Sequence, residues 1–303
     1  MAHTIALIIL ALLGVSLFYV VYQTIVGRPV ERRIVFAYIG LAVSLPLFLK
    51  MTPPVSVTTD VQNLADELAK LPAGSRILCA YDYDPPSAPE LQPMAVAFTK
   101  YAMRHDLKLI CMGLWPVGPQ QATMALEESL ADPEIAAKGL VYGVDYVNLG
   151  FQSGQQFVIQ SMGSEFKRMF PKDDRGSFYD SIPMLNNVVN FSNVDFVMNF
   201  SSGFPGTVEW VQIAVDRFGV KLGAGNTAVQ APQVYPYVRS GQLVGLLGGM
   251  SGAAEFEKAS AEPGRASTFI LSQMFGHAII ILFVVIGNTA YFKAGRRSTG
   301  GKS

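Results

Sequence analysis

Apolar residues gather in three long runs that flank a region of mixed pattern. Residues 4–26 and 34–51 are nearly continuous apolar stretches, and a third, more polar run covers residues 269–292. A helix of about 20 residues spans the roughly 30 Å hydrocarbon core of a bilayer. The pattern predicts two transmembrane helices within residues 1–52 and a third within residues 269–303.

The basic residues beside these runs predict the orientation in the membrane. Outside the central region they lie mostly in the turn after the first run and in the C-terminal tail: Arg28, Arg32, Arg33, Lys293, Arg296, Arg297 and Lys302. Cytoplasmic segments carry such an excess. We expect the N-terminus outside, the turn and the tail in the cytoplasm, and residues 53–268 as an extracytoplasmic domain. A cleaved signal peptide usually begins with basic residues, and Met-Ala-His contains neither lysine nor arginine.

Short continuous apolar stretches alternate with helical periodicity in residues 53–268. The predicted strands are 76–83, 107–114, 145–151, 194–200, 220–223 and 243–247. The predicted helices between and after them are 91–102, 120–130, 155–170, 207–218, 233–239 and 253–259. Continuous apolarity at strand length is typical of parallel strands covered on both faces. The fold class predicted is α/β, a doubly wound, mostly parallel, Rossmann-like sheet inserted between transmembrane helices 2 and 3.

One plan occurs twice in this domain. A strand, a proline-containing loop, a helix and a strand run from Arg76 to Pro116, and again from Val194 to Pro232. The similarity is one of pattern, which ordinary α/β proteins also produce. If the two halves are related, a crevice is expected between them at the carboxyl ends of the strands.

Charge divides the chain in the same way as hydrophobicity. The formal net charge is zero, but every acidic residue except Glu31 lies in the central domain, which is therefore acidic. An acidic domain is a poor partner for nucleic acid or for anionic lipid headgroups. The two cysteines exclude a disulfide-dense scaffold and a cysteine-rich metal module. No cofactor and no metal site is expected.

The first predicted strand ends in Asp82-Tyr83-Asp84. A hydrophobic strand ending Asp-x-Asp resembles the nucleophile motif of haloacid-dehalogenase-type phosphatases, and that resemblance implies attack on phosphorus by Asp82 and magnesium binding by the pair. The chain departs from the motif where Pro85 and Pro86 follow, in place of a threonine or valine. The alternative is a solvated acidic loop stiffened by the prolines.

Three loops that follow predicted strands are candidates for ligand contact. They contain Ser201, Ser202 and Gly203, then Asn226 and Thr227, and last Gly248 and Gly249. Glycines between a strand and a helix can present backbone N–H groups to an anion, or can serve close packing and a turn. If the loops line one crevice, Trp115 is a natural wall for it.

Two features remain after these loops. Cys79 and Cys111 occupy matching places in neighbouring predicted strands, and two buried free thiols are expected rather than a disulfide. Gln273 and His277 are polar residues within the third apolar run. Such residues face a partner or a cavity, so helix packing or proton handling is expected of them.

These observations favour a non-enzymatic role. The leading hypothesis is a structural or interaction subunit of an oligomeric membrane assembly, because the sequence contains no coherent catalytic set. The alternatives are a ligand-sensing or solute-binding domain with a small-molecule ligand, and a divalent-metal phosphohydrolase using Asp82 and Asp84.

Overall fold

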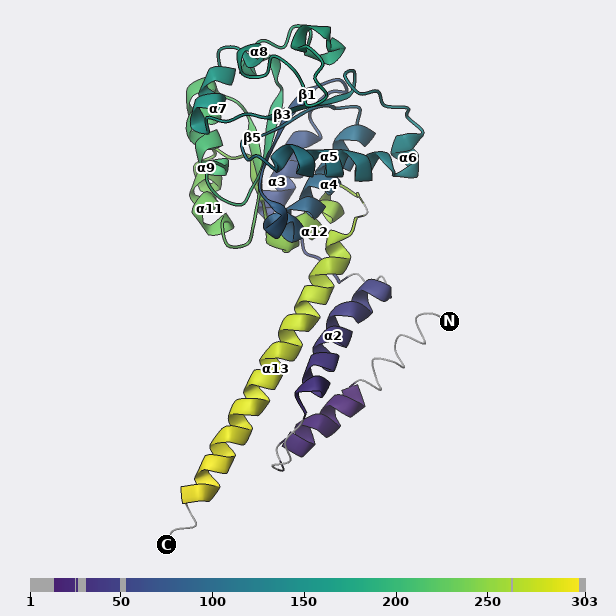
Figure 1. Cartoon of the computed structure of the whole chain (residues 1–303), viewed down its shortest axis with the longest axis vertical. Coiled ribbons are helices and arrows are strands. Elements are labelled where there is room, and N and C mark those ends of the chain that lie inside the picture. The colour runs from purple at the N-terminus through teal and green to yellow at the C-terminus, as the bar shows by residue number, and fades with distance from the viewer. Residues whose placement is uncertain (1–13, 25, 27–30, 50–52, 263, 300–303) are drawn as a thin grey trace. The chain divides into compact units, whose positions relative to one another are not determined.

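A computed structural model describes residues 14–24, 26, 31–49, 53–262 and 264–299. The chain divides into two compact units, Val55–Ser267 and a second made of Met1–Pro54 with Thr268–Ser303. Helix α13, Ala266–Thr299, begins in the first unit and continues into the second. The ribbon is shown in Figure 1.

The unit Val55–Ser267 is built on one parallel sheet of six strands. They are β1 Arg76–Asp82, β2 Lys108–Gly113, β3 Tyr146–Phe151, β4 Phe196–Ser201, β5 Leu222–Asn226 and β6 Gly245–Gly248. Their order is β3-β2-β1-β4-β5-β6, with every pairing parallel. The predicted doubly wound α/β sheet is therefore confirmed.

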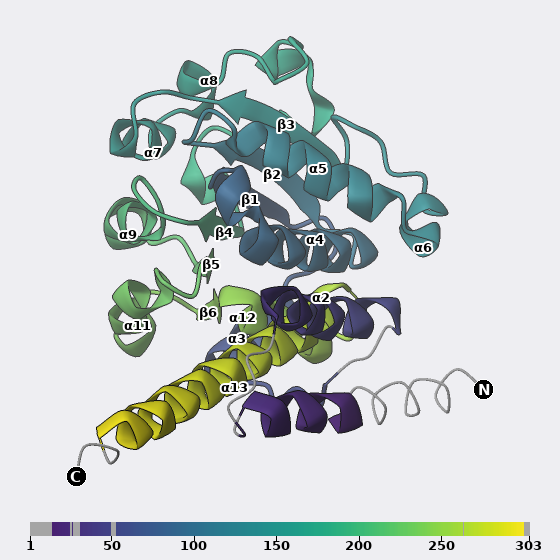
Figure 2. The same ribbon diagram turned by 60° about the horizontal axis from the view of Figure 1, so that its bottom comes forward.

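Helices cover both faces of the sheet, as Figure 2 shows with the sheet seen between two helical layers. One layer contains α3 Thr59–Leu68, α4 Ala88–Arg104, α5 Gly118–Leu130 and α12 Gly249–Ala259. The other contains α7 Gln156–Met162, α9 Thr207–Trp210 and α11 Ala231–Arg239. The two layers explain why the strands are apolar on both faces: β1 is buried from Ile77 to Asp82, and β4 along its whole length.

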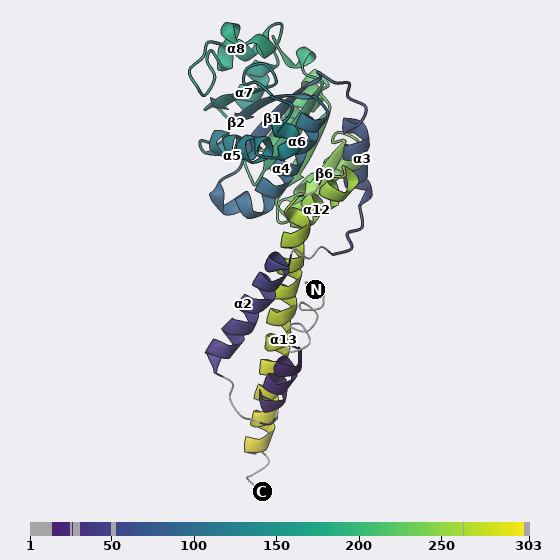
Figure 3. The same ribbon diagram turned by 90° about the vertical axis from the view of Figure 1, so that its right-hand side faces the viewer.

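Short helical segments complete this unit. They are α6 Pro133–Ala136, α8 Phe166–Met169, α10 Asp216–Phe218, the 3₁₀ turns η1 Pro85–Ser87, η2 Tyr179–Ser181, η3 Pro183–Leu185 and η4 Phe191–Asn193, and the π-helical stretch η5 Val211–Val215. The last joins α9 to α10, so the predicted helix 207–218 is continuous but wider in its middle. Figure 3 shows the unit from a third direction.

One predicted helix is divided in the structure, and one helix of the structure was not predicted. The helix expected over residues 155–170 is divided into α7 and α8, because Glu165 is extended and the ring of Phe218 fills the space beside Gly163. Helix α3 was not expected, since its apolar positions Val61, Leu64 and Leu68 lie within a mostly polar segment. It packs against β6 and α12.

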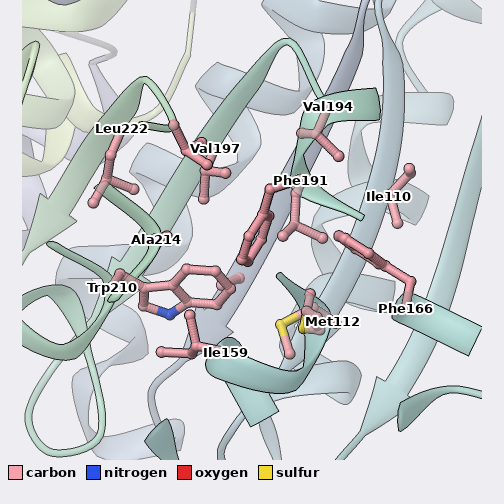
Figure 4. Packing of buried hydrophobic residues seen from close by; sticks show 14 of the residues in the cluster. Ile110, Met112, Ile159, Phe166, Phe191, Val194, Val197, Trp210, Ala214 and Leu222 are labelled. Carbon is pink, nitrogen blue, oxygen red and sulfur yellow. The ribbon is translucent and has the colours of Figure 1, made fainter. Parts of the chain in front are cut away.

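The core between the sheet and the α7–α9 layer is rich in aromatic rings. Trp210 and Phe191 lie 6.3 Å apart between ring centroids, and Phe166 meets Phe191 edge to face at 5.5 Å. Figure 4 shows these rings among aliphatic side chains such as Met112 and Val197. Burial of side chains of this size contributes about 1.5–3 kcal/mol each, so this cluster fixes Trp210, which matters at the site below.

The second unit contains the apolar segments. Residues 14–24 are helical, α2 spans Arg32–Phe48, and α13 supplies the helix predicted at 269–292. Among the described residues, Ala266–Phe292 is the one stretch long and apolar enough to cross a membrane. Helix α2 has 17 residues, and at about 1.5 Å per residue it falls short of a 30 Å core. The predicted insertion between two transmembrane helices is therefore not supported; residues 4–13 and 50–51 lie outside the described part.

Two carboxylates of α12 cap the starts of other helices. Glu255 accepts from the backbone N–H of Thr58 at 2.9 Å, before α3. Glu257 accepts from the N–H groups of Ala266 and Ser267 at 2.7 and 2.9 Å. The first turn of a helix has N–H groups without helical partners, so Glu257 supplies acceptors for the start of α13.

Candidate functional site

A hollow of about 300 Å³ opens at the carboxyl edge of the sheet. Its walls come from the segments that follow three strands: Leu114, Trp115 and Pro116 after β2, Phe151, Ser153, Gly154 and Gln155 from the end of β3, and Phe204 and Pro205 after β4. In parallel α/β sheets this edge is where ligands bind, next to the point where the strand order reverses. Here the order reverses between β1 and β4.

Trp115 joins two walls of the hollow. Its indole N–H donates to the carbonyl oxygen of Pro205 at 2.8 Å. Its ring also lies along Gly203, where an added Cβ would be 3.4 Å from Cζ2 of the indole. Phe151 and Phe204 present rings with 39% and 56% of their surface exposed. The lining therefore combines aromatic rings with the polar side chains of Ser153 and Gln155, and no lining side chain is ionisable.

A buried carboxylate lies beneath these walls. Asp82 ends β1 with no exposed surface. Its Oδ1 accepts from the backbone N–H of Leu114 at 2.7 Å, and its Oδ2 accepts from Asn199 Nδ2 at 2.7 Å and Trp210 Nε1 at 2.8 Å. One carboxylate therefore ties together β1, the segment after β2, β4 and α9.

The network continues from Asn199 to the opposite wall. The hydroxyl of Thr207 donates to Asn199 Oδ1 at 2.7 Å, and Asn226 Nδ2 lies 2.9 Å from that hydroxyl. Asn226 Nδ2 also lies 2.9 Å from Gln230 Oε1, and Gln230 Nε2 donates to the carbonyl of Gly203 at 3.2 Å. Gly203 immediately precedes Phe204. The buried amides therefore support the wall that β4 contributes.

Burial raises the pKa of Asp82 to about 7. The hydrogen bonds from Leu114, Trp210 and Asn199 act against that rise, whereas the nearby carboxylate of Glu209 adds to it. Removal of the ionised form from water outweighs the three donors. The group consequently changes its charge near neutral pH.

The structure brings together some of the predicted site residues. Asp82, Ser201 and Asn226 belong to the buried network, since Asn226 Nδ2 also donates to the Ser201 carbonyl at 3.2 Å. Gly203 and Trp115 lie between the network and the hollow. Ser202 donates its N–H to the backbone oxygen of Asp82 at 3.2 Å.

Other predicted residues have local roles away from the hollow. Asp84 accepts from the hydroxyl of Ser87 at 2.9 Å, next to η1. The carbonyl of Thr227 accepts the N–H groups of Gln230 and Ala231 at the start of α11.

The predicted glycine loop is packed closely against its neighbours. Gly249 has φ +59°, which favours glycine, and a Cβ there would lie 2.9 Å from that of Ala228. Gly248 lies beside α11, where a Cβ would meet that of Ala231 at 3.4 Å. Close approach and a turn account for these glycines.

The two cysteines are neighbours in the sheet. Cys79 of β1 and Cys111 of β2 are register partners, and both are buried free thiols. Burial, together with the other sulfur, holds the pKa of Cys79 well above its ordinary value. This agrees with the expected pair of unbonded thiols.

The two polar residues predicted within the third apolar run both lie on α13. Gln273 and His277 are exposed there. Gly276 is buried, and a Cβ on it would lie 3.1 Å from Cγ2 of Val43 in α2. The small residue, rather than the polar ones, is at the contact between helices within this unit.

Most residues of the hollow carry no signal that was recognised in the sequence. Phe151, Phe204 and Pro205 were not singled out, nor were the network residues Asn199, Thr207, Trp210 and Gln230. A signal did exist for Asn199, which is an amide in the middle of the apolar strand Phe196–Ser201. A buried polar side chain needs partners, so Asn199 pointed to further polar groups nearby.

Comparison with protein-family models, with curated proteins and with solved structures finds no match. No group of three or more His, Cys, Asp or Glu side chains that could hold a metal ion occurs in the described part of the chain. The geometry of the hollow and its support therefore carries the functional argument.

Proposed function

We propose that this chain is a membrane-anchored α/β domain that binds a small, uncharged ligand with a flat apolar face. The observation that carries the proposal is the hollow at the carboxyl edge, bounded by Trp115, Phe151 and Phe204. Aromatic walls favour stacking with a ring. Because no ionisable side chain lines the hollow, a charged ligand would lose its hydration without gaining an opposite charge.

The polar groups of the hollow suit an uncharged ring compound. Ser153 and Gln155 contribute a hydroxyl and an amide, which both donate and accept hydrogen bonds. A volume of about 300 Å³ is at the small end for ligand pockets. Adenosine, indole and N-acetylglucosamine are suitable first probes, since each has one face that can stack.

The experiment uses the two tryptophans as separate reporters. The full chain, in mild detergent and labelled with 5-fluorotryptophan, gives one ¹⁹F signal from Trp115 at the hollow and one from Trp210 in the core. Binding is expected to shift the Trp115 signal strongly. Phe204→Ala should weaken binding about five- to tenfold, because it removes a stacking wall worth about 1–1.5 kcal/mol.

A matched variant controls for a general effect of losing an exposed ring. Phe178 is 64% exposed and is not part of the hollow, so Phe178→Ala should bind as the unaltered chain does. If no uncharged ring compound moves the Trp115 signal, or if both variants weaken binding equally, the hollow is not the binding site.

The anchoring proposal rests on α13 and on the charges beside it. Ala266–Phe292 has the length and apolarity of a membrane span, and the tail that follows is basic. We infer that the tail is cytoplasmic, that the apolar segments before residue 52 also enter the membrane, and that the α/β unit is extracytoplasmic. Protease added outside sealed right-side-out vesicles should degrade the α/β unit, whereas an intact unit would refute this topology.

A second candidate function is an interaction subunit of a membrane assembly. An exposed ring beside the hollow favours it, since Phe157 is 60% exposed and a Cβ added to Gly154 of the hollow would lie 3.8 Å from the Phe157 ring. Clustered exposed apolar groups mark binding surfaces for proteins as well as for ligands. Crosslinking in mild detergent tests this role, which predicts a defined oligomer that Phe157→Asp disrupts.

A further inference from the structure

The wall of the hollow that contains Trp115 is hydrogen-bonded to one buried side chain, Asp82. The backbone N–H of Leu114 donates to Asp82 Oδ1 at 2.7 Å, and Trp115 is the next residue. The other end of Trp115 is held by the Pro205 carbonyl. The position of the indole therefore depends on Asp82 at one end and on the segment after β4 at the other.

Every hydrogen-bonding partner of the Asp82 carboxylate is a donor. Leu114 N–H meets Oδ1, and the Asn199 amide and the Trp210 indole both meet Oδ2. An ionised carboxylate accepts all three, but a protonated one carries a hydrogen that needs an acceptor of its own. The acceptor end of Asn199 is already occupied by the hydroxyl of Thr207.

The geometry decides which contact a proton would disturb. Oδ1 accepts a single donor and Oδ2 accepts two. A proton from solvent that binds Oδ1 breaks one hydrogen bond, whereas on Oδ2 it breaks up to two. Protonation at Oδ1 places its hydrogen against the N–H of Leu114, so the contact that is lost is the one that holds the wall of the hollow.

We propose that Asp82 is a positioning residue for the hollow: its carboxylate fixes Leu114 and the Trp115 wall, and protonation of that carboxylate releases the wall and weakens ligand binding. This inference rests on the proposed function of the hollow and adds its regulation. It places control of the site in a residue that no ligand touches, since Asp82 has no exposed surface.

The groups around Asp82 determine the pH at which its carboxylate is protonated. Helix α9 brings the carboxylate of Glu209, which raises the pKa of Asp82, and α9 also brings the neutral indole of Trp210. The segment after β2 and strand β4 contact the carboxylate through a backbone N–H and an amide. Burial in these surroundings raises the pKa to about 7.

The test needs no ligand. The full chain labelled with 5-fluorotryptophan is titrated from pH 5 to pH 9 in mild detergent, and the two ¹⁹F signals are assigned with Trp115→Phe and Trp210→Phe. The Trp115 signal is expected to move with a midpoint near pH 7, together with that of Trp210. In Asp82→Asn the Trp115 signal should stay constant, at a position away from that of the ionised form.

Asp84→Asn is the matched control, because Asp84 lies two residues further on and bonds only locally to Ser87 among the contacts described. It should titrate as the unaltered chain does. A Trp115 signal that is constant from pH 5 to pH 9 overturns the proposal, and so does one that still titrates in Asp82→Asn.

A second variant covers the case in which Asp82→Asn does not fold. Glu209→Gln keeps an acceptor for the Gly206 N–H, which Glu209 accepts at 2.8 Å, but removes the charge near Asp82. The midpoint should move to lower pH, and an unchanged midpoint would assign the titration to another group.

Once a probe binds, its affinity should fall at least tenfold from pH 8 to pH 5. A failed ligand search leaves this titration intact, so the two proposals fail separately.

Discussion

The indole N–H of Trp115 donates to the carbonyl oxygen of Pro205 at 2.8 Å, and so joins the segment after β2 to the segment after β4. The two segments belong to different halves of the sheet, on either side of the point between β1 and β4 where the strand order reverses. A hydrogen bond therefore connects two walls of the hollow directly.

Trp115→Phe keeps a ring in this position but removes the donor. A hydrogen bond of this kind is worth about 1 kcal/mol, which corresponds to about a fivefold change in local opening. Amide hydrogen exchange of residues 203–207 should therefore accelerate about fivefold, with exchange of α4 unchanged. Equal acceleration in both places would mean that the whole domain, and not the crosslink, has been weakened.

Asn199→Ala removes a donor from Asp82 and an acceptor from Thr207 in one step. Buried groups left without partners cost about 1–3 kcal/mol each. We expect the free energy of unfolding to fall by about 2–4 kcal/mol, measured by urea titration of the full chain in detergent. Asn63→Ala, on the exposed side of α3, is the control and should change it by less than about 0.5 kcal/mol.

Two glycines of the loop after β4 should respond differently to alanine. A Cβ on Gly206 would overlap the hydroxyl of Ser201 and the carbonyl of Gly203, whereas one on Gly203 would make an ordinary 3.4 Å contact with Trp115. Gly206→Ala should lower the midpoint of thermal unfolding by several degrees, consistent with an overpacking cost of about 1–3 kcal/mol. Gly203→Ala should leave the midpoint nearly unchanged; equal losses would contradict the packing described.

Asp82 makes stability depend on pH in a direction that its burial fixes. Its pKa rises from 3.8 to about 7, so the folded chain binds this proton more tightly than the unfolded chain does. The contribution of Asp82 to the free energy of unfolding is thus greatest at low pH. It falls as the pH rises from about 4 to about 7, by up to about 1.4 kcal/mol per pH unit.

The measurement compares the free energy of unfolding of the unaltered chain with that of Asp82→Asn. Urea titrations of the unaltered chain and of Asp82→Asn at several pH values should diverge through this window, since only the first has the titrating carboxyl. Carboxyls such as Glu67 and Asp132 have lowered pKa values and act in the opposite direction at lower pH, but they are common to both chains. Parallel curves would show that Asp82 does not titrate there.

The buried thiols should be inert in the folded chain. Cys79 and Cys111 have no exposed surface, and burial raises the pKa of Cys79. Iodoacetamide at pH 8 should leave both unmodified and should modify both after denaturation, as read by intact mass. A mass two units lower without reductant would reveal a disulfide and contradict the unbonded pair.

Strand positions could be predicted because strands covered by helices on both faces have continuous apolar sequences. Arg76–Asp82 and Lys108–Gly113 are buried on both faces, so an unbroken apolar run was enough to find them. The partition of acidic residues into one domain was also visible along the chain. Helix α3 was missed, because only a narrow stripe of its residues is apolar.

The hollow could not be predicted in the same way, because its residues come from segments far apart in sequence. Trp115 and Pro205 are 90 positions apart, yet they are in direct contact. Asp82 was selected as a candidate for its acidic neighbour Asp84, but its importance comes from Asn199 and Trp210, which no local motif connects to it. Sequence reasoning found the edge of the sheet and one wall, and the rest depended on the order of the strands.

That strand order has a consequence for synthesis. Two donors that satisfy the Asp82 carboxylate lie 117 and 128 residues further along the chain. At about 5–20 residues per second, the ribosome needs roughly ten seconds to add them. Until then the centre of the sheet lacks β4, and β1 has an unpaired edge with a polar group at its end. The first half of the domain therefore needs protection during translation, and chains that end before Trp210 should be the ones that aggregate.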